Sequence, residues 1–280
     1  MSQKTQRHEI TIKRVVYQIP GMDAVTIRRD VEYRVTDAGG LTIDLYHPPD
    51  SKGEARAPAV IFVNGYPDPG AQKIIGCKRK EMESCISWGR LTAASGLVAI
   101  NYTTGNEPAT DIHALLQYVR QNAAVLGIDE NRIGVWACSG NVPLALSVLM
   151  REDREYLKCG VLCYGCMLDL DGFTHIAEAA RTWGFVNPCV AKSVEDLPHD
   201  IPLFIARAGR DEIPHLNETL DRFLCKTLTC NLPVTLVNHS EAQHAFDLLH
   251  DSETSREIIK QILAFMRFHL LAREWDPGYS

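Results

Sequence analysis

The stretch "RIGVWACSGNVPLAL" (132–146) decides the fold. Residues 132–136 form an apolar run typical of a strand that is covered on both faces, as in a parallel sheet. Residues 142–150 then follow with a pattern typical of a helix. Cys138 and Ser139 stand side by side at the junction. Because ligands of a parallel sheet bind where its strands end, the stretch predicts an α/β fold with a site at this turn.

The same alternation of strands and helices runs along the rest of the chain. Two segments that alternate apolar and polar residues, 25–35 and 41–48, predict an antiparallel hairpin around a turn at 37–40. Further strands are predicted at 59–63, 97–102, 132–136, 159–165, 202–209 and 234–239, and helices over 82–96, 108–127, 142–150, 213–228 and 253–271. This order predicts a mostly parallel central sheet with an antiparallel N-terminal edge and helices on both faces.

The length of the chain favours one domain. A chain of 280 residues buries a substantial core as a single α/β domain, so we predict one domain over 1–280. Residues 166–200 interrupt the rhythm between the fourth and fifth parallel strands, because they exceed the usual connection of a few residues. We expect a small helical, cap-like insertion there. Whether it covers a site or is an inert crossover stays open.

Composition excludes several classes of protein. Hydrophobic residues make up 45% and charged residues 23%, close to the average of soluble globular proteins. A net charge of -6 argues against a nucleic-acid partner, and we interpret the one dense basic run, 73–80, as a solvated loop. The N-terminus lacks the apolar core of a secretory signal, and no stretch reaches the roughly 18 apolar residues of a membrane span. We therefore expect a cytoplasmic protein without a membrane partner.

The cysteines predict free thiols. Nine are scattered along the chain without a compact disulfide framework, which fits a reducing compartment. Cys163 and Cys166 have the two-residue spacing of redox and zinc sites. Their flanks are apolar and no second pair stands near them, so a buried strand end is favoured. No metal site is predicted.

Reactive residues follow three of the predicted strands. Ser139 or Cys138 follows 132–136, Asp211 follows 202–209, and His244 follows 234–239. A nucleophilic serine needs a base to take its proton and a carboxylate to orient and stabilise the imidazole. Nucleophile, acid and histidine in this chain order fit one known arrangement of these roles.

Sterics favour Ser139 over Cys138 as the nucleophile. A sharp turn from strand to helix crowds the residues two before and two after the nucleophile, so both must be small. Cys138 would put Trp136 at the first of these positions, where it does not fit. Ser139 puts Ala137 and Asn141 there. A serine that caps the next helix, beside a buried cysteine, is the alternative.

Three segments resemble the α/β-hydrolase superfamily, with its serine esterases and its dienelactone-hydrolase-like and peptidase-like branches. They are "VIFVNGYPDPG" (60–70), 132–146, and "PLFIARAGRDEIP" (202–214) followed by "HSEAQHAFD" (239–247). The family motif G-x-S-x-G is matched by Ala-Cys-Ser-Gly-Asn, with alanine and asparagine in place of the two glycines. The Gly-x-Asp of the acid and the histidine followed by a small residue and an aromatic are also matched.

The resemblance implies a carboxylic ester hydrolase that needs no metal or organic cofactor. It assigns Ser139 as nucleophile, His244 as base and Asp211 as the acid that orients the base. It also implies two oxyanion donors, the N–H of Gly140 and the N–H of Tyr66, which stands where many relatives have His-Gly-Gly. A small-molecule ester is the expected partner.

Rival residues exist for the acid and the base. Asp169 and Asp171 follow the preceding strand, where some relatives keep their acid, but we favour Asp211. His239 is the rival base. It ends an apolar strand, where packing or solvent contact is expected, so we favour His244.

The sequence says less about the acyl group of the substrate and about the molecule that accepts it. The aromatic residues of the segment 166–200 predict an apolar lining for a small or medium acyl group. The predicted substrate contacts are Tyr66, Cys138, Phe173, Trp183 and Phe185. An acyltransferase on the same triad and a non-catalytic binding protein on this fold remain alternatives. The sequence leaves the oligomeric state open.

Overall fold

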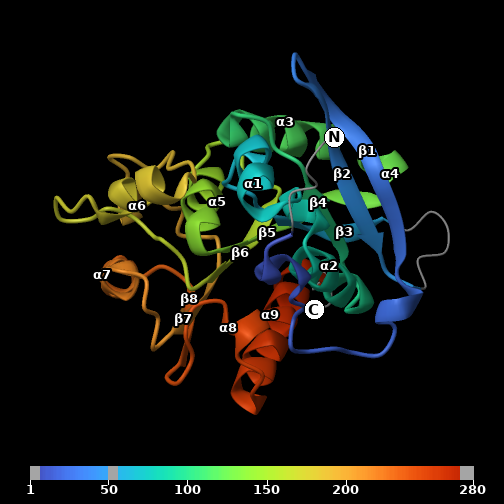
Figure 1. Cartoon of the computed structure of the whole chain (residues 1–280). Helices are drawn as coiled ribbons and strands as arrows, with labels where there is room; N and C mark the ends of the chain where they lie inside the picture. The colour runs from blue at the N-terminus through green and yellow to red at the C-terminus, as the bar shows by residue number, and fades with distance from the viewer. Residues whose placement is uncertain (1–6, 50–55, 272–280) are drawn as a thin grey trace, which may run out of the picture.

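The computed structural model describes residues 7–49 and 56–271, in which eight strands form one sheet (Figure 1). The spatial order is β1-β2-β4-β3-β5-β6-β7-β8. The strands are β1 (Thr26–Thr36), β2 (Gly39–His47), β3 (Ala57–Phe62), β4 (Val98–Tyr102), β5 (Ile128–Cys138), β6 (Leu157–Cys163), β7 (Leu203–Ala208) and β8 (Val234–His239). β1 pairs with β2 and β2 with β4 in antiparallel fashion, and the other neighbours are parallel. The predicted mostly parallel sheet with an antiparallel N-terminal edge is confirmed.

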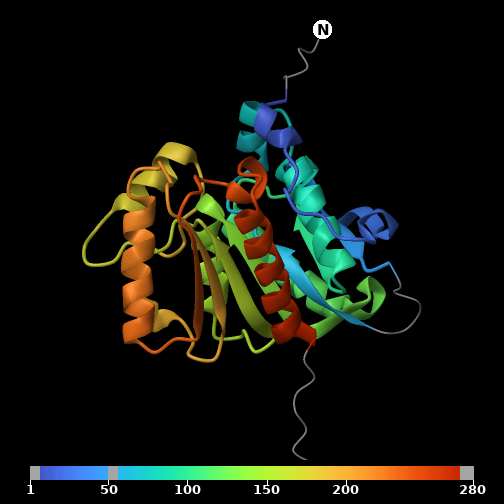
Figure 2. The ribbon, with the colours of Figure 1, turned by 90° about the horizontal axis from the view of Figure 1, so that it is seen from below.

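Helices cover both faces of the sheet, as predicted (Figure 2). They are α1 (Asp68–Ile75), α2 (Glu83–Ala94), α3 (Pro108–Gln121), α4 (Ala123–Leu126), α5 (Val142–Leu149), α6 (His175–Trp183), α7 (Leu216–Thr229), α8 (Phe246–Leu249) and α9 (Glu253–Leu271). Side chains of α2 and α9 pack into the core on one face, and those of α3, α5 and α7 pack on the other. None of the described helices is long and apolar enough to cross a membrane.

The central strands are continuously apolar because both of their faces are buried. In β3, Ile61 packs into one core cluster and its neighbour Val60 into the other. In β5, Val135 packs into the same cluster as Ile61, and Trp136 packs into the same cluster as Val60. Successive side chains of a strand point to opposite faces, so a strand between two helical layers has no face left for polar residues.

The segment between β3 and α2 differs from the expectation. The basic run 73–80 in this segment is predicted to be a solvated loop, but the segment contains α1 and a 3-10 turn at Arg79–Glu81. Lys80, at the end of that run, is buried, and its Nζ lies 2.6 Å from a carboxylate oxygen of Asp30 and 2.6 Å from one of Asp44. The prediction of a solvated loop is wrong at this end, because two carboxylates from the hairpin offset the cost of burying the ammonium group.

Residues 166–200, which connect β6 to β7 and are called the excursion below, contain α6 and a 3-10 turn at Val194–Asp196. It returns to the sheet beside the loop that follows β3, where the Val186 N–H donates to the carbonyl oxygen of Gly65 at 2.9 Å. At its start, the Cys166 N–H donates to the carbonyl oxygen of Ser139 at 3.2 Å. The excursion therefore lies at the end of the sheet where the predicted reactive residues are.

Candidate active site

The structure brings together three of the residues predicted from the strand ends. Ser139 follows β5 directly, while Asp211 and His244 lie in the loops after β7 and β8. His244 Nε2 is 2.9 Å from Ser139 Oγ, and His244 Nδ1 is 2.6 Å from Asp211 Oδ2. Because these strands are parallel, their carboxyl ends meet at one edge of the sheet and place the three side chains in hydrogen-bonding order.

Ser139 occupies a strained turn. Its φ is 55°, in the left-handed region that costs an L-residue other than glycine about 1–2 kcal/mol. The residue ends the extended backbone of β5 and begins the 3-10 turn Ser139–Asn141, which leads into α5. The serine side chain thus stands at the tip of a sharp strand-to-helix turn, as expected for a nucleophile elbow.

Asn141, which replaces a motif glycine, connects this turn to the loop after β3. Its side chain is buried; Oδ1 accepts from the Gly65 N–H at 2.9 Å, and Nδ2 donates to the Cys138 carbonyl at 3.0 Å. A Cβ at Gly65 would stand 3.1 Å from the Gly140 carbonyl oxygen. The missing side chain at Gly65 therefore lets the loop after β3 approach the backbone of residues 140 and 141.

The carboxylate of Asp211 is positioned to hydrogen-bond the imidazole ring of His244. The Asp211 side chain is fully buried, and Oδ1 accepts from the Ile213 N–H at 3.0 Å, which leaves Oδ2 for His244. The edge-to-face contact of His244 with the Tyr164 ring, at 4.8 Å between centroids, adds a second restraint on the imidazole. These contacts direct Nε2 toward Ser139.

The rival acid and base residues have other partners. The two Asp169 oxygens accept the N–H groups of residues 176 and 177 at the start of α6. Asp171 is exposed and lies 3.6 Å from Arg222. His239 is buried with Nε2 3.1 Å from Ser255 Oγ. None of the three is recorded in contact with Ser139 in the described part of the chain.

The hydroxyl group of Tyr66 lies beside Ser139. The Tyr66 N–H donates to Asn64 Oδ1 at 3.2 Å, so this predicted oxyanion donor already has an acceptor. The hydroxyl oxygen lies 2.5 Å from the position that a Cβ on Gly140 would take, next to Ser139. Burial raises the pKa of Tyr66 to about 12, which keeps the hydroxyl protonated at neutral pH. Of the two donors on Tyr66, the hydroxyl is therefore the one that lies beside the turn.

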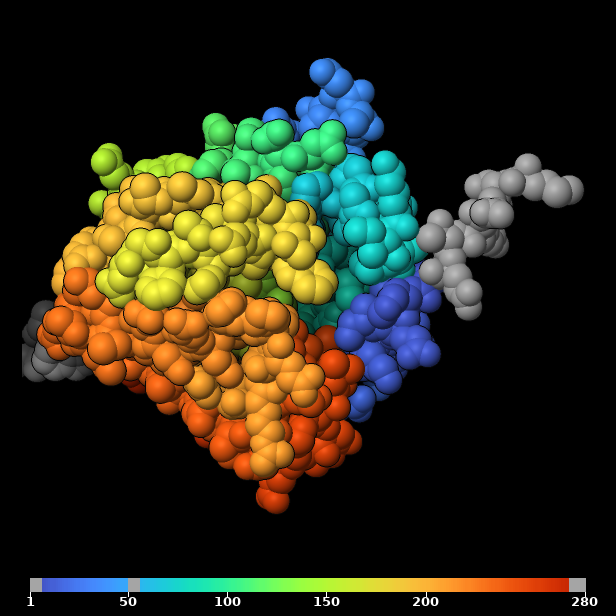
Figure 3. All heavy atoms as spheres, turned by 60° about the vertical axis from the view of Figure 1, so that its left-hand side comes forward, coloured from blue at the N-terminus to red at the C-terminus, as the bar shows by residue number. Residues whose placement is uncertain are grey.

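A cavity of about 320 Å³ opens beside Ser139 and His244. Part of its wall is an aromatic trio, in which the Trp136 ring centroid lies 5.2 Å from that of Phe62 and 5.1 Å from that of Trp88. Figure 3 shows the surface hollowed where the yellow excursion, the cyan α1 segment and the dark-blue N-terminal segment approach one another. A predominantly apolar cavity next to hydrogen-bonded polar groups is the usual form of a small-molecule site.

Comparison with known proteins identifies the fold. No protein-family model and no curated protein sequence matches the chain. Among solved structures, esterase 2 from the planctomycete Thermogutta terrifontis aligns with a TM-score of 0.63 at 20% identity over 92% of this chain and 96% of its own. A bacterial heroin esterase aligns with a TM-score of 0.64 at 17% identity over 89% and 86%. This chain has the α/β-hydrolase fold.

Three aromatic residues of the excursion were predicted to contact the substrate, and they differ in burial and in their neighbours. Phe185 is buried, with its ring centroid 5.8 Å from that of Tyr66. Phe173 lies under Arg222, whose Cζ is 4.2 Å from the ring centroid, and Trp183 is 59% exposed. Of the described residues, those that line the cavity do not include these three aromatics. Phe185 comes nearest to the site, as a support behind Tyr66.

Cys138 lines the cavity beside Ser139. Burial first, and then the nearby Asp247, raise the pKa of its thiol to about 12. A thiol is a weak nucleophile until it ionises. Cys163 and Cys166 are buried, as expected of a strand end, and all nine cysteines lie in the described part of the chain as free thiols.

Asp247 is a cavity residue that sequence reasoning missed. It follows the histidine loop, and its carboxylate accepts from Trp88 Nε1 at 2.7 Å and from the Tyr164 hydroxyl at 2.6 Å. Burial raises the pKa of this carboxyl group above its usual value. The aspartate directly after the His-Ala-Phe match was the available signal. Its two donors satisfy both oxygens, so it acts as an anchor between α2, β6 and α8.

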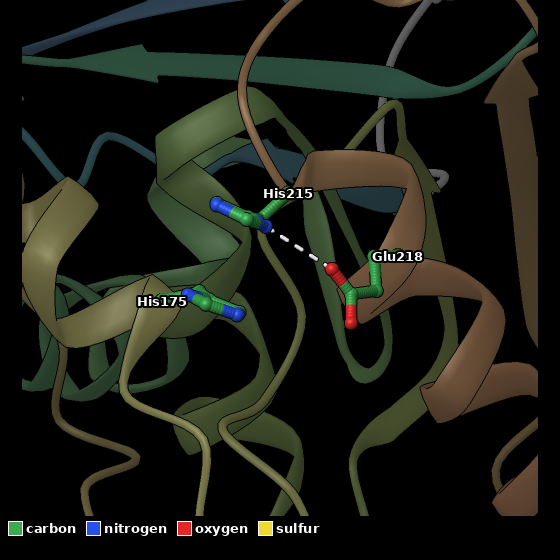
Figure 4. Close-up of side chains that lie close together, drawn as sticks. All are labelled: His175, His215 and Glu218. Carbon is green, nitrogen blue, oxygen red and sulfur yellow. Dashed lines mark hydrogen bonds and ion pairs between the residues drawn. The ribbon is translucent and has the colours of Figure 1, made fainter.

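A second group of titratable residues lies outside the cavity, where α6 approaches α7 (Figure 4). The rings of His175 and His215 are stacked, 3.8 Å apart and within 5° of parallel, and His215 Nδ1 lies 3.1 Å from Glu218 Oε2. Imidazole lone pairs lie in the plane of the ring. Two stacked rings therefore do not direct their nitrogens to one point, and the observed arrangement is a packing contact with a hydrogen bond.

Proposed function

We propose that the protein is a serine hydrolase that cleaves carboxylic esters through an acyl-enzyme on Ser139. The observation that carries the proposal is the chain of short hydrogen bonds from Ser139 Oγ through His244 to Asp211, at the mouth of an apolar cavity. A serine held only as a helix cap needs no imidazole at its hydroxyl group and no buried carboxylate behind that imidazole.

The reaction begins with proton transfer from Ser139 Oγ to His244 Nε2 as the oxygen attacks the ester carbonyl. The imidazolium then gives this proton to the departing alcohol, which leaves the acyl group on the serine. His244 Nε2 then takes a proton from water as the water attacks the acyl group, and it returns this proton to Ser139 Oγ as the acid leaves. Asp211 keeps the imidazole oriented and stabilises its charged form through Nδ1–H.

The negative oxygen of each tetrahedral intermediate needs donors that are already in place. We assign two, the Gly140 N–H at the start of the turn and the Tyr66 hydroxyl. The assignment of the hydroxyl rather than the Tyr66 N–H rests on the hydrogen bond that the N–H makes to Asn64 and on the position of the phenol oxygen over Gly140.

The cavity suggests the size of the acyl group. A space of about 320 Å³ with aromatic walls suits a small or medium acyl chain. The structural neighbours are named esterases, and one form of the Thermogutta terrifontis enzyme is described as phosphoramylated by tabun (TM-score 0.62, 19% identity, 91% of this chain and 98% of its own). These names support ester hydrolysis as the first activity to test.

The test is labelling with a fluorophosphonate, which reacts with activated serines whatever the natural acyl group, followed by peptide mass spectrometry. We expect one adduct on Ser139, and we expect Ser139→Ala to lower the rate of 4-nitrophenyl butyrate hydrolysis by about a thousandfold or more. Ser193→Ala, at a partly exposed serine outside the cavity lining, serves as the matched control. A Ser139→Ala protein that retains the parent rate would refute the proposal.

A further inference from the structure

Two adjacent basic residues of the 3-10 turn after α1 differ in their partners. Lys80 is saturated by the carboxylates of Asp30 and Asp44. Arg79 lines the same cavity as Ser139 and His244. Among the described residues, no carboxylate lies within the 4.0 Å ion-pair distance of its guanidinium group. A cation without an anion thus belongs to the wall of the candidate active site.

The backbone of Arg79 is anchored so that its side chain stays in this wall. Its N–H donates to Asp68 Oδ1 at 2.9 Å, while Asp68 Oδ2 accepts from the Thr104 N–H at 2.8 Å. Asp68 is buried, and both of its oxygens are occupied by backbone donors. The carboxylate that comes nearest to serving as a counter-ion is therefore engaged in holding the turn in place.

The guanidinium group of Arg79 is stacked beside the nucleophile. Its Cζ lies 4.7 Å from the centroid of the Tyr66 ring, and the hydroxyl of the same ring is next to Ser139. The tyrosine ring therefore bridges the cation and the reacting serine. Stacking on an aromatic face leaves the in-plane N–H donors of a guanidinium group free to bind an anion.

A partly buried guanidinium group in an apolar cavity is costly unless an anion accepts its hydrogen bonds. Asp247, the other charged residue of the wall near His244, has both oxygens occupied by Trp88 and Tyr164. Since Asp68 and Asp247 are both occupied, an anion for Arg79 has to come with the substrate. A carboxylate matches the planar fork of a guanidinium group, and its single negative charge balances the single positive charge of Arg79.

We propose that Arg79 binds a carboxylate group of the substrate, so that the enzyme acts on esters that carry a carboxylate in addition to the ester bond. The inference rests on the proposed ester hydrolysis and names its substrate class. The body of such a substrate lies against Phe62, Trp88 and Trp136, while Arg79 holds its charged end. A phosphate dianion would leave one charge unbalanced between these aromatic walls.

The test compares anionic esters with neutral counterparts of nearly the same size. One pair places the charge on the acyl side: 4-nitrophenyl hydrogen adipate and 4-nitrophenyl methyl adipate. A second pair places it on the alcohol side: 4-acetoxybenzoate and its methyl ester. In at least one pair, we expect the parent to favour the anionic ester in kcat/KM, and Arg79→Gln to lower this preference by about tenfold or more. The exposed Lys73→Gln, in the same basic run, should keep the preference.

The outcomes separate this inference from the proposed function. If the parent hydrolyses the neutral esters and favours neither anionic ester, the role of Arg79 is refuted and ester hydrolysis stands. An equal preference in Arg79→Gln and Lys73→Gln also refutes it. If no ester is cleaved, the proposed function fails, and calorimetry of the parent with monomethyl adipate and dimethyl adipate decides the anion site alone. Equal binding of the two compounds, or binding of neither, then overturns it.

Discussion

Removal of the Asn141 amide tests how the nucleophile turn is held. In Asn141→Ala, the Gly65 N–H loses its acceptor at 2.9 Å and the Cys138 carbonyl loses its donor at 3.0 Å. Both groups lie in the protein interior, since the side chain that joins them is 3% exposed. The methyl group that remains cannot replace either bond.

The magnitude follows from these two bonds. A buried donor or acceptor without a partner costs about 1–3 kcal/mol, so two of them should lower the free energy of unfolding by about 2–4 kcal/mol, allowing for partial relaxation. Activity should fall as well, because Gly65 precedes Tyr66 and a looser loop displaces its hydroxyl from Ser139. We expect kcat to fall about ten- to a hundredfold, since a displacement on the scale of 1 Å has such effects.

Two measurements check this prediction. Urea unfolding followed by circular dichroism gives the free energy of unfolding, and hydrolysis of 4-nitrophenyl butyrate gives kcat. Asn131→Ala, an exposed asparagine in β5, is the matched control and should stay within about 0.5 kcal/mol of the parent. If Asn141→Ala behaves like this control in stability and in kcat, the amide does not tie the turn to the loop.

Three further predictions concern residues around the cavity. Tyr66→Phe should lower kcat on 4-nitrophenyl butyrate by about a hundredfold or more, because it removes only the hydroxyl assigned to the oxyanion. Since burial raises the pKa of Cys138 to about 12, iodoacetamide at pH 8 should alkylate the exposed Cys225 and leave Cys138 unmodified, as read by peptide mass spectrometry. Burial also raises the pKa of Asp247 in the folded protein, so the folded state holds this proton more tightly than the unfolded chain, and the resulting stability is lost as pH rises. The unfolding free energy of Asp247→Asn relative to the parent should therefore increase from about pH 4 upward, by at most about 1.4 kcal/mol per pH unit, in urea unfolding at a series of pH values.

The order of strands and helices could be predicted because each element depends on the pattern of apolar and polar residues within a short stretch of sequence. The apolar runs of β3, β4, β5 and β6 are continuous since helices cover both faces of those strands, and the hairpin β1-β2 alternates with a turn between its strands. Parallel strands end at one edge, so residues directly after them share that edge. This rule narrows the candidates to a few residues, and the sterics of the turn together with the resemblance favour Ser139, Asp211 and His244 among them.

Contacts between distant polar groups were decided by the tertiary structure. The basic run 73–80 gives no sign that Lys80 meets Asp30 and Asp44, which lie in a hairpin 50 and 36 residues away. It also gives no sign that Arg79 meets no carboxylate among the residues that the structure describes. The sequence predicted the Tyr66 N–H as an oxyanion donor, and only the packing shows that this N–H donates to Asn64 Oδ1 and that the hydroxyl lies beside Ser139.

The sequence by itself determined the fold class and the residues that follow the strands, because periodicity and turn chemistry act over a few neighbours. Only the tertiary structure decided which of those residues hydrogen-bond and what surrounds them. The bond between Asn141 and Gly65 joins residues 76 positions apart. The free energy of such a bond depends on burial and on distances of a few tenths of an ångström, and these are set only when the layers pack together.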